Sequence, residues 1–297
     1  MNRSVPFQGI VGYPITPFDV AGKVNLAVYR GLLDRLIAGK VNAVAPLGSA
    51  GVLPYLSDEE RESVTETTLS HVDGRLPVLV GVSSLTTERT LHHARFAEQA
   101  GAAAVMIIPM SYWRLSEDEI FRHYQTVAEA ISIPIMAYNN PATGGSDMSP
   151  EFLARLLTIS NVTMIKESTG DVNRLHRLRQ AAGESVAFFN GSNPLALDAF
   201  VAGATGWCTA AANLIPELNG ALYAAVVTRG DWDEAQTIFR RQLPLLQFLV
   251  DRGLPRTAAA GLEIDGIDVG PLRAPLQPLA ANERERLQTL LAQVRRS

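Results

Sequence analysis

The stretch VTMIKESTGD, Val162–Asp171, is an apolar run that stops at a lysine and a glutamate and continues with small polar residues. The chain contains three lysines. Lys23 lies in a glycine-containing turn, DVAGKVN, and Lys40 follows Gly39 at the end of a helical pattern, so we expect both in solvent. Lys166 is the lysine whose surroundings predict an interior position. The continuous run before it is typical of a strand that is buried on both faces.

Short apolar runs of this kind recur along the chain. Besides the run that ends at Lys166, they occupy 9–16, 41–48, 76–82, 102–109, 133–139, 185–191 and 205–211. Amphipathic stretches of helical length separate them, and two of these, 56–72 and 115–131, begin with a serine followed three residues later by glutamate, which is a capping box. Eight strands alternating with eight helices predict a (β/α)8 barrel, the TIM barrel fold.

The remaining sequence is helical and lacks a further strand pattern. Its amphipathic stretches are 231–251, 255–264 and 282–296. We therefore predict a catalytic barrel domain over residues 1–229 and a C-terminal helical domain over 230–297 that packs on the barrel. A length of 297 residues could hold two average domains, but barrels of this type reach that size as one unit.

Composition limits the class of protein. With 47% hydrophobic and 19% charged residues, the chain can bury a large core. A formal net charge of −4 and the lack of a basic stripe argue against a nucleic-acid or anionic-membrane partner. The single cysteine, Cys208, indicates a reducing compartment. The polar N-terminus does not read as a signal peptide, and no apolar run reaches membrane-spanning length, so we expect a cytoplasmic protein.

In such barrels the chemistry lies where strands run into the loops at their C-terminal ends. Tyr138 ends the fifth predicted strand and Lys166 the sixth, so the two should share one rim. A partly desolvated lysine there is a nucleophile for a carbonyl carbon, and a tyrosine can carry protons to and from it. Further candidates at the strand ends are Gly48, Ser49, Tyr112, Gly191 and Cys208.

Each residue also has a purely structural interpretation. A lysine at a strand end often pairs with a carboxylate, and Glu167 is adjacent. A tyrosine there is often core packing. The turn LGSAG, which contains Gly48 and Ser49, could cradle a carboxylate through its backbone N–H groups, but such turns are common. The joint occurrence of Lys166 and Tyr138 on neighbouring strands favours the functional interpretation.

Signals for other chemistry are weaker. His92 and His93 are adjacent in a helical stretch, where we expect them to face different directions and to be exposed to solvent. Neither fits a metal-ligand pattern, so we predict no metal site. The sequence also contains neither a GxxxxGK[ST] phosphate loop nor a GxGxxG fingerprint.

Four motifs in this order resemble one known family across nearly the whole chain. They are YPITPFD at 13–19, PLGSAG at 46–51, YNNPATGG at 138–145 and IKESTGD at 165–171. This pattern resembles the dihydrodipicolinate synthase / N-acetylneuraminate lyase family. The resemblance implies a (β/α)8 enzyme with a C-terminal helical domain, typically a homotetramer, that binds pyruvate or another 2-oxo acid as a Schiff base.

The resemblance implies roles for several residues. It places the Schiff-base lysine at Lys166, the proton-handling tyrosine at Tyr138, and the carboxylate loop at Ser49 and Ala50, with Ser49 also in the hydroxyl relay. A second relay tyrosine, which in the family often reaches into a neighbouring subunit, corresponds to Tyr112 in PMSYWR, a stretch one residue longer than usual.

Two positions depart from the synthases of lysine biosynthesis. Ala50 replaces the second residue of their Thr-Thr pair, and Thr143 stands where they carry an arginine for the second substrate's carboxylate. Arg114 is a candidate substitute for that arginine. We therefore expect an aldolase or dehydratase of a hydroxy-2-oxo acid or sugar acid rather than the lysine-pathway synthase.

The sequence is compatible with several functions. The expected mechanism is a class I lyase reaction with no cofactor besides the Schiff base on Lys166, and the family includes aldolases, dehydratases, synthases and a deaminase. The first alternative is 4-hydroxy-tetrahydrodipicolinate synthase, which condenses pyruvate with aspartate semialdehyde. Others are a metal- or phosphate-dependent barrel enzyme and a non-catalytic 2-oxo-acid-binding protein on the same fold.

Overall fold

A computed structural model describes residues 5–296 of the chain. Within these residues, each predicted apolar run contains a strand. The strands are β1 Gly9–Gly12, β2 Ala43–Val44, β3 Leu79–Gly81, β4 Ala104–Ile107, β5 Ile135–Asn139, β6 Val162–Glu167, β7 Ala187–Asn190 and β8 Gly206–Thr209. The first four residues, on which the expectation of no signal peptide partly rests, lie outside the described range.

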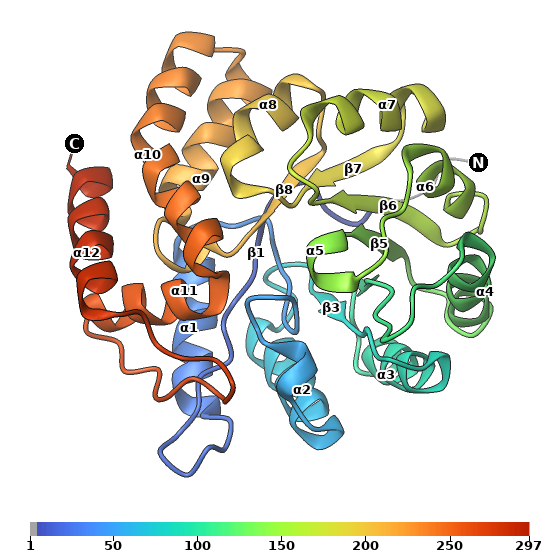
Figure 1. The fold of residues 1–297 in the computed structure, drawn as a ribbon, viewed down its shortest axis with the longest axis horizontal. Helices are drawn as coiled ribbons and strands as arrows, with labels where there is room; N and C mark the ends of the chain where they lie inside the picture. The colour runs from blue at the N-terminus through green and yellow to red at the C-terminus, as the bar shows by residue number, and fades with distance from the viewer. Residues whose placement is uncertain (1–4, 297) are drawn as a thin grey trace.

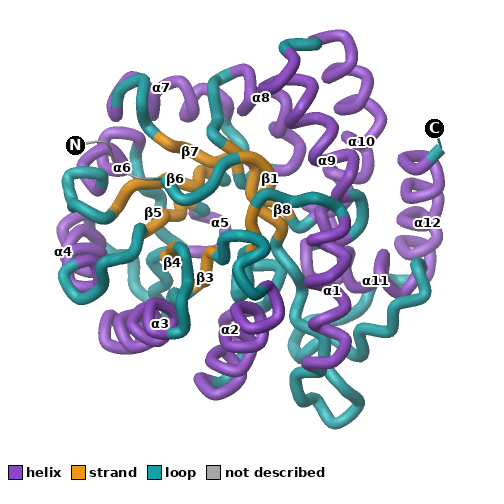
Figure 2. Tube along the Cα trace, turned by 180° about the vertical axis from the view of Figure 1, so that it is seen from behind, coloured by secondary structure: helices purple, strands orange, loops and turns teal. Residues whose placement is uncertain are grey.

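The strands form one parallel sheet that curves into a barrel. Their order is β2-β1-β8-β7-β6-β5-β4-β3, so neighbours in sequence are neighbours in the sheet and β1 pairs with β8. Across the remaining seam, a parallel bridge joins Val44 to Val78. The strands occupy the centre and the helices surround them (Figure 2). This arrangement confirms the predicted (β/α)8 barrel with a C-terminal helical region.

The helices begin where local sequence signals predict. Ser57 and Ser116 each accept a bond from the backbone N–H three residues on, and both predicted capping boxes form. The helices of the barrel region are α1 Leu26–Ala38, α2 Asp58–Val72, α3 Thr87–Gln99, α4 Glu117–Ala128, α5 Pro141–Gly144, α6 Pro150–Leu156, α7 Val172–Ala182, α8 Ala196–Val201 and α9 Pro216–Tyr223. Short 3-10 turns occupy Leu53–Tyr55, Asn193–Leu195 and Ala211–Asn213, and a π-helical turn, Ala224–Arg229, follows α9.

Three further helices, α10 Trp232–Arg252, α11 Leu254–Ile264 and α12 Ala281–Arg295, lie together on one side of the barrel beside α9 and α1 (Figure 1). Asp265, just after α11, ties this region to the barrel because it accepts from Arg35 of α1 at 2.7 Å and from Arg295 of α12 at 2.6 Å. The division of the chain into two domains at residue 229 stays a prediction.

The barrel places every strand's carboxyl end at one rim. Tyr138 and Lys166 occupy opposite positions in the register of β5 and β6. Most strand residues are buried, as expected for strands covered on both faces. Among residues 5–296, no helix is both long enough and apolar enough to cross a membrane.

Candidate active site

Lys166 is buried inside the carboxyl end of the barrel. It is 4% exposed, whereas Lys23 and Lys40 lie in solvent as predicted. Its Nζ lies 3.9 Å from the ring centre of Tyr138, on the neighbouring strand. The two residues that the sequence singled out are therefore in direct contact.

A second aromatic ring, that of Tyr13, faces the same amine. Tyr13 follows β1 directly, and its ring centre lies 4.2 Å from Lys166 Nζ. The Tyr13 hydroxyl donates to the sulfur of Met106 at 3.1 Å. Sequence reasoning missed this residue, although it belongs to YPITPFD and follows the first strand, which is the signal that could have identified it. Two aromatic rings thus face the buried amine.

Glu167 does not pair with Lys166. Successive residues of a strand point to opposite faces, so the two side chains diverge. The Glu167 carboxylate accepts from Asn139 Nδ2 at 3.0 Å and from the Thr169 backbone N–H at 2.8 Å, and Arg174 Nε lies 3.4 Å away. No carboxylate forms an ion pair with Lys166 in the described part of the chain. The interpretation of Lys166 as half of a structural ion pair with Glu167 is therefore wrong.

The hydroxyl of Tyr138 has polar neighbours on two sides. Asn140 Nδ2 donates to it at 2.9 Å, and Ser49 Oγ lies 3.5 Å away. Burial raises the pKa of Tyr138, but the charge of Lys166 and hydrogen bonding from Asn140 and Ser49 outweigh this effect, so the net pKa lies below the usual phenol value.

Tyr13 has the opposite environment. Burial, reinforced by Cys208 and Tyr138, raises the pKa of Tyr13 well above its usual value, so this phenol stays protonated. The pKa values of the two phenols beside the amine are thus shifted in opposite directions. Such a difference separates a group that carries protons from one that only packs. Tyr138 is the phenol suited to move protons at the amine.

The predicted carboxylate loop lies beside these rings. A side chain at Gly48 would collide with the Tyr13 ring, so the position requires glycine. Leu47 adopts the left-handed conformation with φ 58°, a strained backbone that positions the loop after β2. Ala50 is buried and Ser49 is partly buried. Among the described residues, the backbone N–H groups of Ser49 and Ala50 make no hydrogen bond within the chain.

Gly191 and Cys208 also lie at the amine. A methyl group at Gly191 would come within 2.8 Å of Lys166 Cε and would collide with Ser168 Oγ. Cys208, on β8, is buried, and burial raises the pKa of its thiol despite the lowering effects of Lys166 and Tyr13. The thiol is therefore protonated and contributes to the wall of the site rather than acting as a nucleophile.

Comparison with known proteins agrees with this geometry. The model of the dihydrodipicolinate synthetase family matches residues 6–294. The chain belongs to this family. Membership confirms the resemblance drawn from the sequence motifs and the predicted class of enzyme, a class I lyase.

Relatives within the family cover nearly the whole chain. The 4-hydroxy-tetrahydrodipicolinate synthase of Bacillus velezensis is 30% identical over 94% of this chain and 96% of its own. A structure described as a putative dihydrodipicolinate synthetase from Pseudomonas aeruginosa is 52% identical, with a TM-score of 0.95, and covers 98% of this chain and 100% of that chain. A prophage protein of the same family from E. coli, solved in complex with pyruvate, is 27% identical, with a TM-score of 0.92 over 98% of this chain and 99% of its own.

Three candidates do not join the amine site within one chain. Tyr112 is 90% exposed, and its ring packs edge-on against Trp113, which is 78% exposed. Tyr112 makes no hydrogen bond to Tyr138 in the described residues. Thr143 and Arg114 are likewise exposed. The loop after β4 places Tyr112 in solvent, so Tyr112 does not reach the amine site of its own chain.

The prediction that His93 is exposed to solvent is wrong. His93 is 5% exposed because it faces α2, where its Nε2 lies 3.0 Å from Asp58. His92 is exposed as predicted, but the two rings lie 5.2 Å apart instead of diverging. One donor atom each from Glu62, His92 and His93 lie within 4.8 Å of one another.

These groups already have partners. His92 Nε2 lies 2.8 Å from Glu62. Asp58, the partner of His93, also pairs with Arg89 at 2.6 Å. The positive charge of Arg61 acts on the His93 ring as well. Because Arg61 and Arg89 accompany the carboxylates and imidazoles of this cluster, we interpret it as an ion-pair network between α2 and α3.

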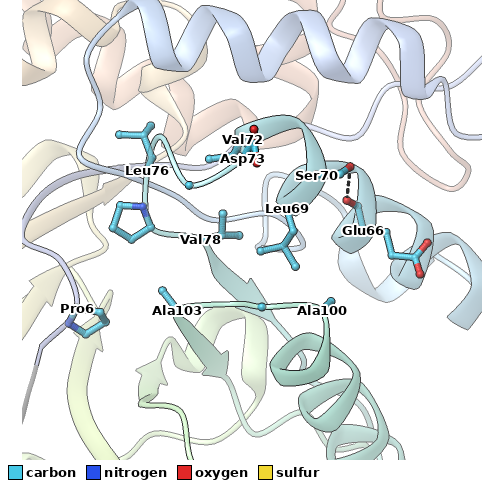
Figure 3. A pocket seen from close by; sticks show the side chains of 13 residues that line it. Pro6, Glu66, Leu69, Ser70, Val72, Asp73, Leu76, Val78, Ala100 and Ala103 are labelled. Atoms are coloured by element: carbon cyan, nitrogen blue, oxygen red, sulfur yellow. Dashed lines mark hydrogen bonds between the residues drawn. The ribbon is translucent and has the colours of Figure 1, made fainter.

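A separate hollow of about 700 Å³ lies at the opposite end of the barrel. Figure 3 shows side chains around it that come from segments just before strands, such as Pro6 before β1, Val78 before β3 and Ala103 before β4. The amino ends of the strands form this face, whereas barrel chemistry belongs to the carboxyl ends. The hollow shares no lining residue with the amine site.

Proposed function

We propose that this chain acts on pyruvate or a related 2-oxo acid through a Schiff base on Lys166. The observation that carries the proposal is a buried amine with no carboxylate partner in the described residues, held between two aromatic rings beside an acidified phenol. The relative solved with pyruvate supports the choice of 2-oxo acid.

The chemistry follows from the positions of these groups. Lys166 Nζ attacks the keto carbon, the carbonyl oxygen takes up a proton, and the carbinolamine then loses water to give an iminium. Tyr138, with Ser49 within reach, delivers and removes the protons. The iminium accepts the electron pair that is released when the bond beside it breaks, and an enamine results. No metal or further cofactor is required by this sequence of steps.

The loop after β2 is suited to the carboxylate of the 2-oxo acid. The unpaired backbone N–H groups of Ser49 and Ala50 are donors next to Tyr138, and backbone N–H groups in a turn form a common carboxylate cradle. Replacement of a hydroxyl residue by Ala50 leaves these donors in place. Gly48 allows the loop to approach the Tyr13 ring.

Borohydride trapping tests the Schiff base directly. Incubation with pyruvate and borohydride should leave a reduced adduct on the peptide that contains Lys166, located by mass spectrometry. Lys166→Arg should abolish both the adduct and turnover because arginine stays protonated in proteins. An adduct on Lys23 or Lys40, or no adduct at all, contradicts the proposal.

The second substrate separates two reactions. We propose an aldolase or dehydratase of a hydroxy-2-oxo acid or sugar acid, because Thr143 offers an exposed hydroxyl where the lysine-pathway synthases place an arginine. A charge-assisted pair is roughly twice as strong as a neutral hydrogen bond, so a semialdehyde carboxylate binds less well here. The curated relatives named 4-hydroxy-tetrahydrodipicolinate synthase favour the alternative, condensation with aspartate semialdehyde.

A steady-state assay decides between them. If pyruvate and aspartate semialdehyde react with kcat/KM in the range of roughly 10⁴–10⁸ M⁻¹s⁻¹, the synthase alternative is correct. A panel of hydroxy-2-oxo acids and sugar acids, monitored for release of pyruvate or of 2-oxoglutarate semialdehyde, identifies the substrate of the aldolase or dehydratase.

We also propose a cytoplasmic homo-oligomer, a tetramer by likeness to the family. The exposed pair Tyr112 and Trp113 supports an interface, because adjacent large aromatic side chains in solvent mark contact surfaces. Light scattering after size-exclusion chromatography measures the assembly. A monomer at micromolar concentration contradicts this part of the proposal.

A further inference from the structure

Asn140 begins the short helix α5 but does not cap it. Asparagine is favoured at this position because its side-chain oxygen accepts from the first free backbone N–H groups of a helix. No such side-chain bond forms here, and the N–H groups of Thr143 and Gly144 bond to the Asn140 backbone oxygen instead. The side-chain amide donates to the Tyr138 hydroxyl at 2.9 Å.

We propose that Asn140 is a positioning residue that holds the phenol of Tyr138 for proton transfer at Lys166. This inference rests on the proposed function. An amide N–H only donates, so the Tyr138 oxygen accepts and its own proton points elsewhere. Ser49 Oγ, at 3.5 Å, lies within reach of that proton. The bond thus sets the direction in which the phenol releases its proton.

The same bond favours the form of Tyr138 that takes up a proton. A donor to the phenol oxygen stabilises the phenolate more than the neutral phenol, and it does so strongly in a buried site. Hydrogen bonding from Asn140 is one of the effects that offset the burial of Tyr138. Without this hydrogen bond, the charge of Lys166 would offset less of the effect of burial on the pKa of Tyr138.

Three substitutions at this position separate the possible roles. Asn140→Val removes the donor at similar volume. Asn140→Asp keeps the shape but offers only acceptors, so it reverses the interaction. Asn140→Ser is the control for the helix, because serine is a good N-cap but its side chain is too short to make the same bond.

The ionisation of Tyr138 is the first readout. Phenolate absorbance is titrated for each protein and for its Tyr138→Phe counterpart, and the difference isolates this residue. We expect its pKa to rise by about one unit in Asn140→Val and in Asn140→Ser, and further in Asn140→Asp. An unchanged titration of Tyr138 in Asn140→Val and Asn140→Asp overturns the inference.

The rate at which the pyruvate adduct forms is the second readout. The rate of borohydride-trappable adduct formation should fall at least about tenfold in Asn140→Val and Asn140→Ser, with little change in the pyruvate concentration that gives half saturation. Normal rates in Asn140→Ser would show that the bond to Tyr138 is not needed and would overturn the inference. If the wild-type protein forms no adduct, the proposed function fails, while the titration of Tyr138 still tests the role of Asn140.

Discussion

Gly191 leaves the space that the Lys166 side chain occupies: a methyl group on Gly191 would lie 2.8 Å from Lys166 Cε. Gly191→Ala should therefore displace the amine, together with the Ser168 side chain, whose Oγ would lie 1.7 Å from the same methyl group. A displacement of about 1 Å at a reacting group can cost roughly 10² in rate, so turnover and adduct formation should fall by at least that factor. Gly220→Ala is the matched control, because Gly220 lies in α9 with open space around it. Equal activity of the two variants contradicts this account.

Tyr138→Phe should reduce turnover by roughly 10²–10⁴-fold, the usual contribution of a positioned acid or base. Tyr13→Phe keeps the second ring at Lys166 and removes a hydroxyl that stays protonated, so its loss should be much smaller. Circular dichroism should show both variants folded. Near-normal turnover in Tyr138→Phe would assign proton handling to another group.

Arg174→Met should destabilise the fold because it leaves the Glu167 carboxylate buried with its amide and backbone donors but no cation. The Arg174 side chain is 13% exposed and the Glu167 side chain 2%. Breaking a buried pair costs about 3 kcal/mol in the free energy of unfolding, and Glu167→Gln in the same chain should restore much of it. Urea unfolding at one protein concentration measures both. A double variant no more stable than Arg174→Met would show that the two residues are not coupled.

Stability should decrease in mild acid. Burial lowers the pKa of His123 to about 4, and burial with the charge of Arg61 lowers that of His93 to about 4, whereas unfolded histidine titrates near 6.5. Between these values the unfolded chain binds more protons, so the free energy of unfolding falls as pH decreases from about 6.5 to 4.

His123→Gln tests this relation. Glutamine can keep the hydrogen bond to Thr87, now 2.9 Å from His123 Nδ1, but does not titrate. The free energy of unfolding of this variant should decrease less between pH 7 and pH 4.5 than that of the wild type. His92→Gln, at an exposed position, is the control. An identical pH dependence in His123→Gln and wild type would rule out His123 as a source of the effect.

Local signals made much of the fold predictable. Each apolar run contains a strand, and Ser57 and Ser116 cap helices as predicted, because strand burial and capping depend on residues a few positions apart. The alternation of these elements is enough to predict the barrel, and the barrel places Tyr138 beside Lys166. The sequence also showed that Lys166, unlike Lys23 and Lys40, lies in a setting typical of the interior.

The tertiary structure decided what surrounds the amine. Tyr13 meets Lys166 from the end of β1 and Gly191 meets it from the end of β7, and no local pattern reports the space between side chains on different strands. The same limit explains His93, whose burial depends on how α3 packs against α2. Asn140 carries a helix-capping signal, but its amide donates instead to the Tyr138 hydroxyl, two residues earlier in the chain, at 2.9 Å. The sequence by itself determined which groups lie at the rim, and packing between strands determined which of them touch.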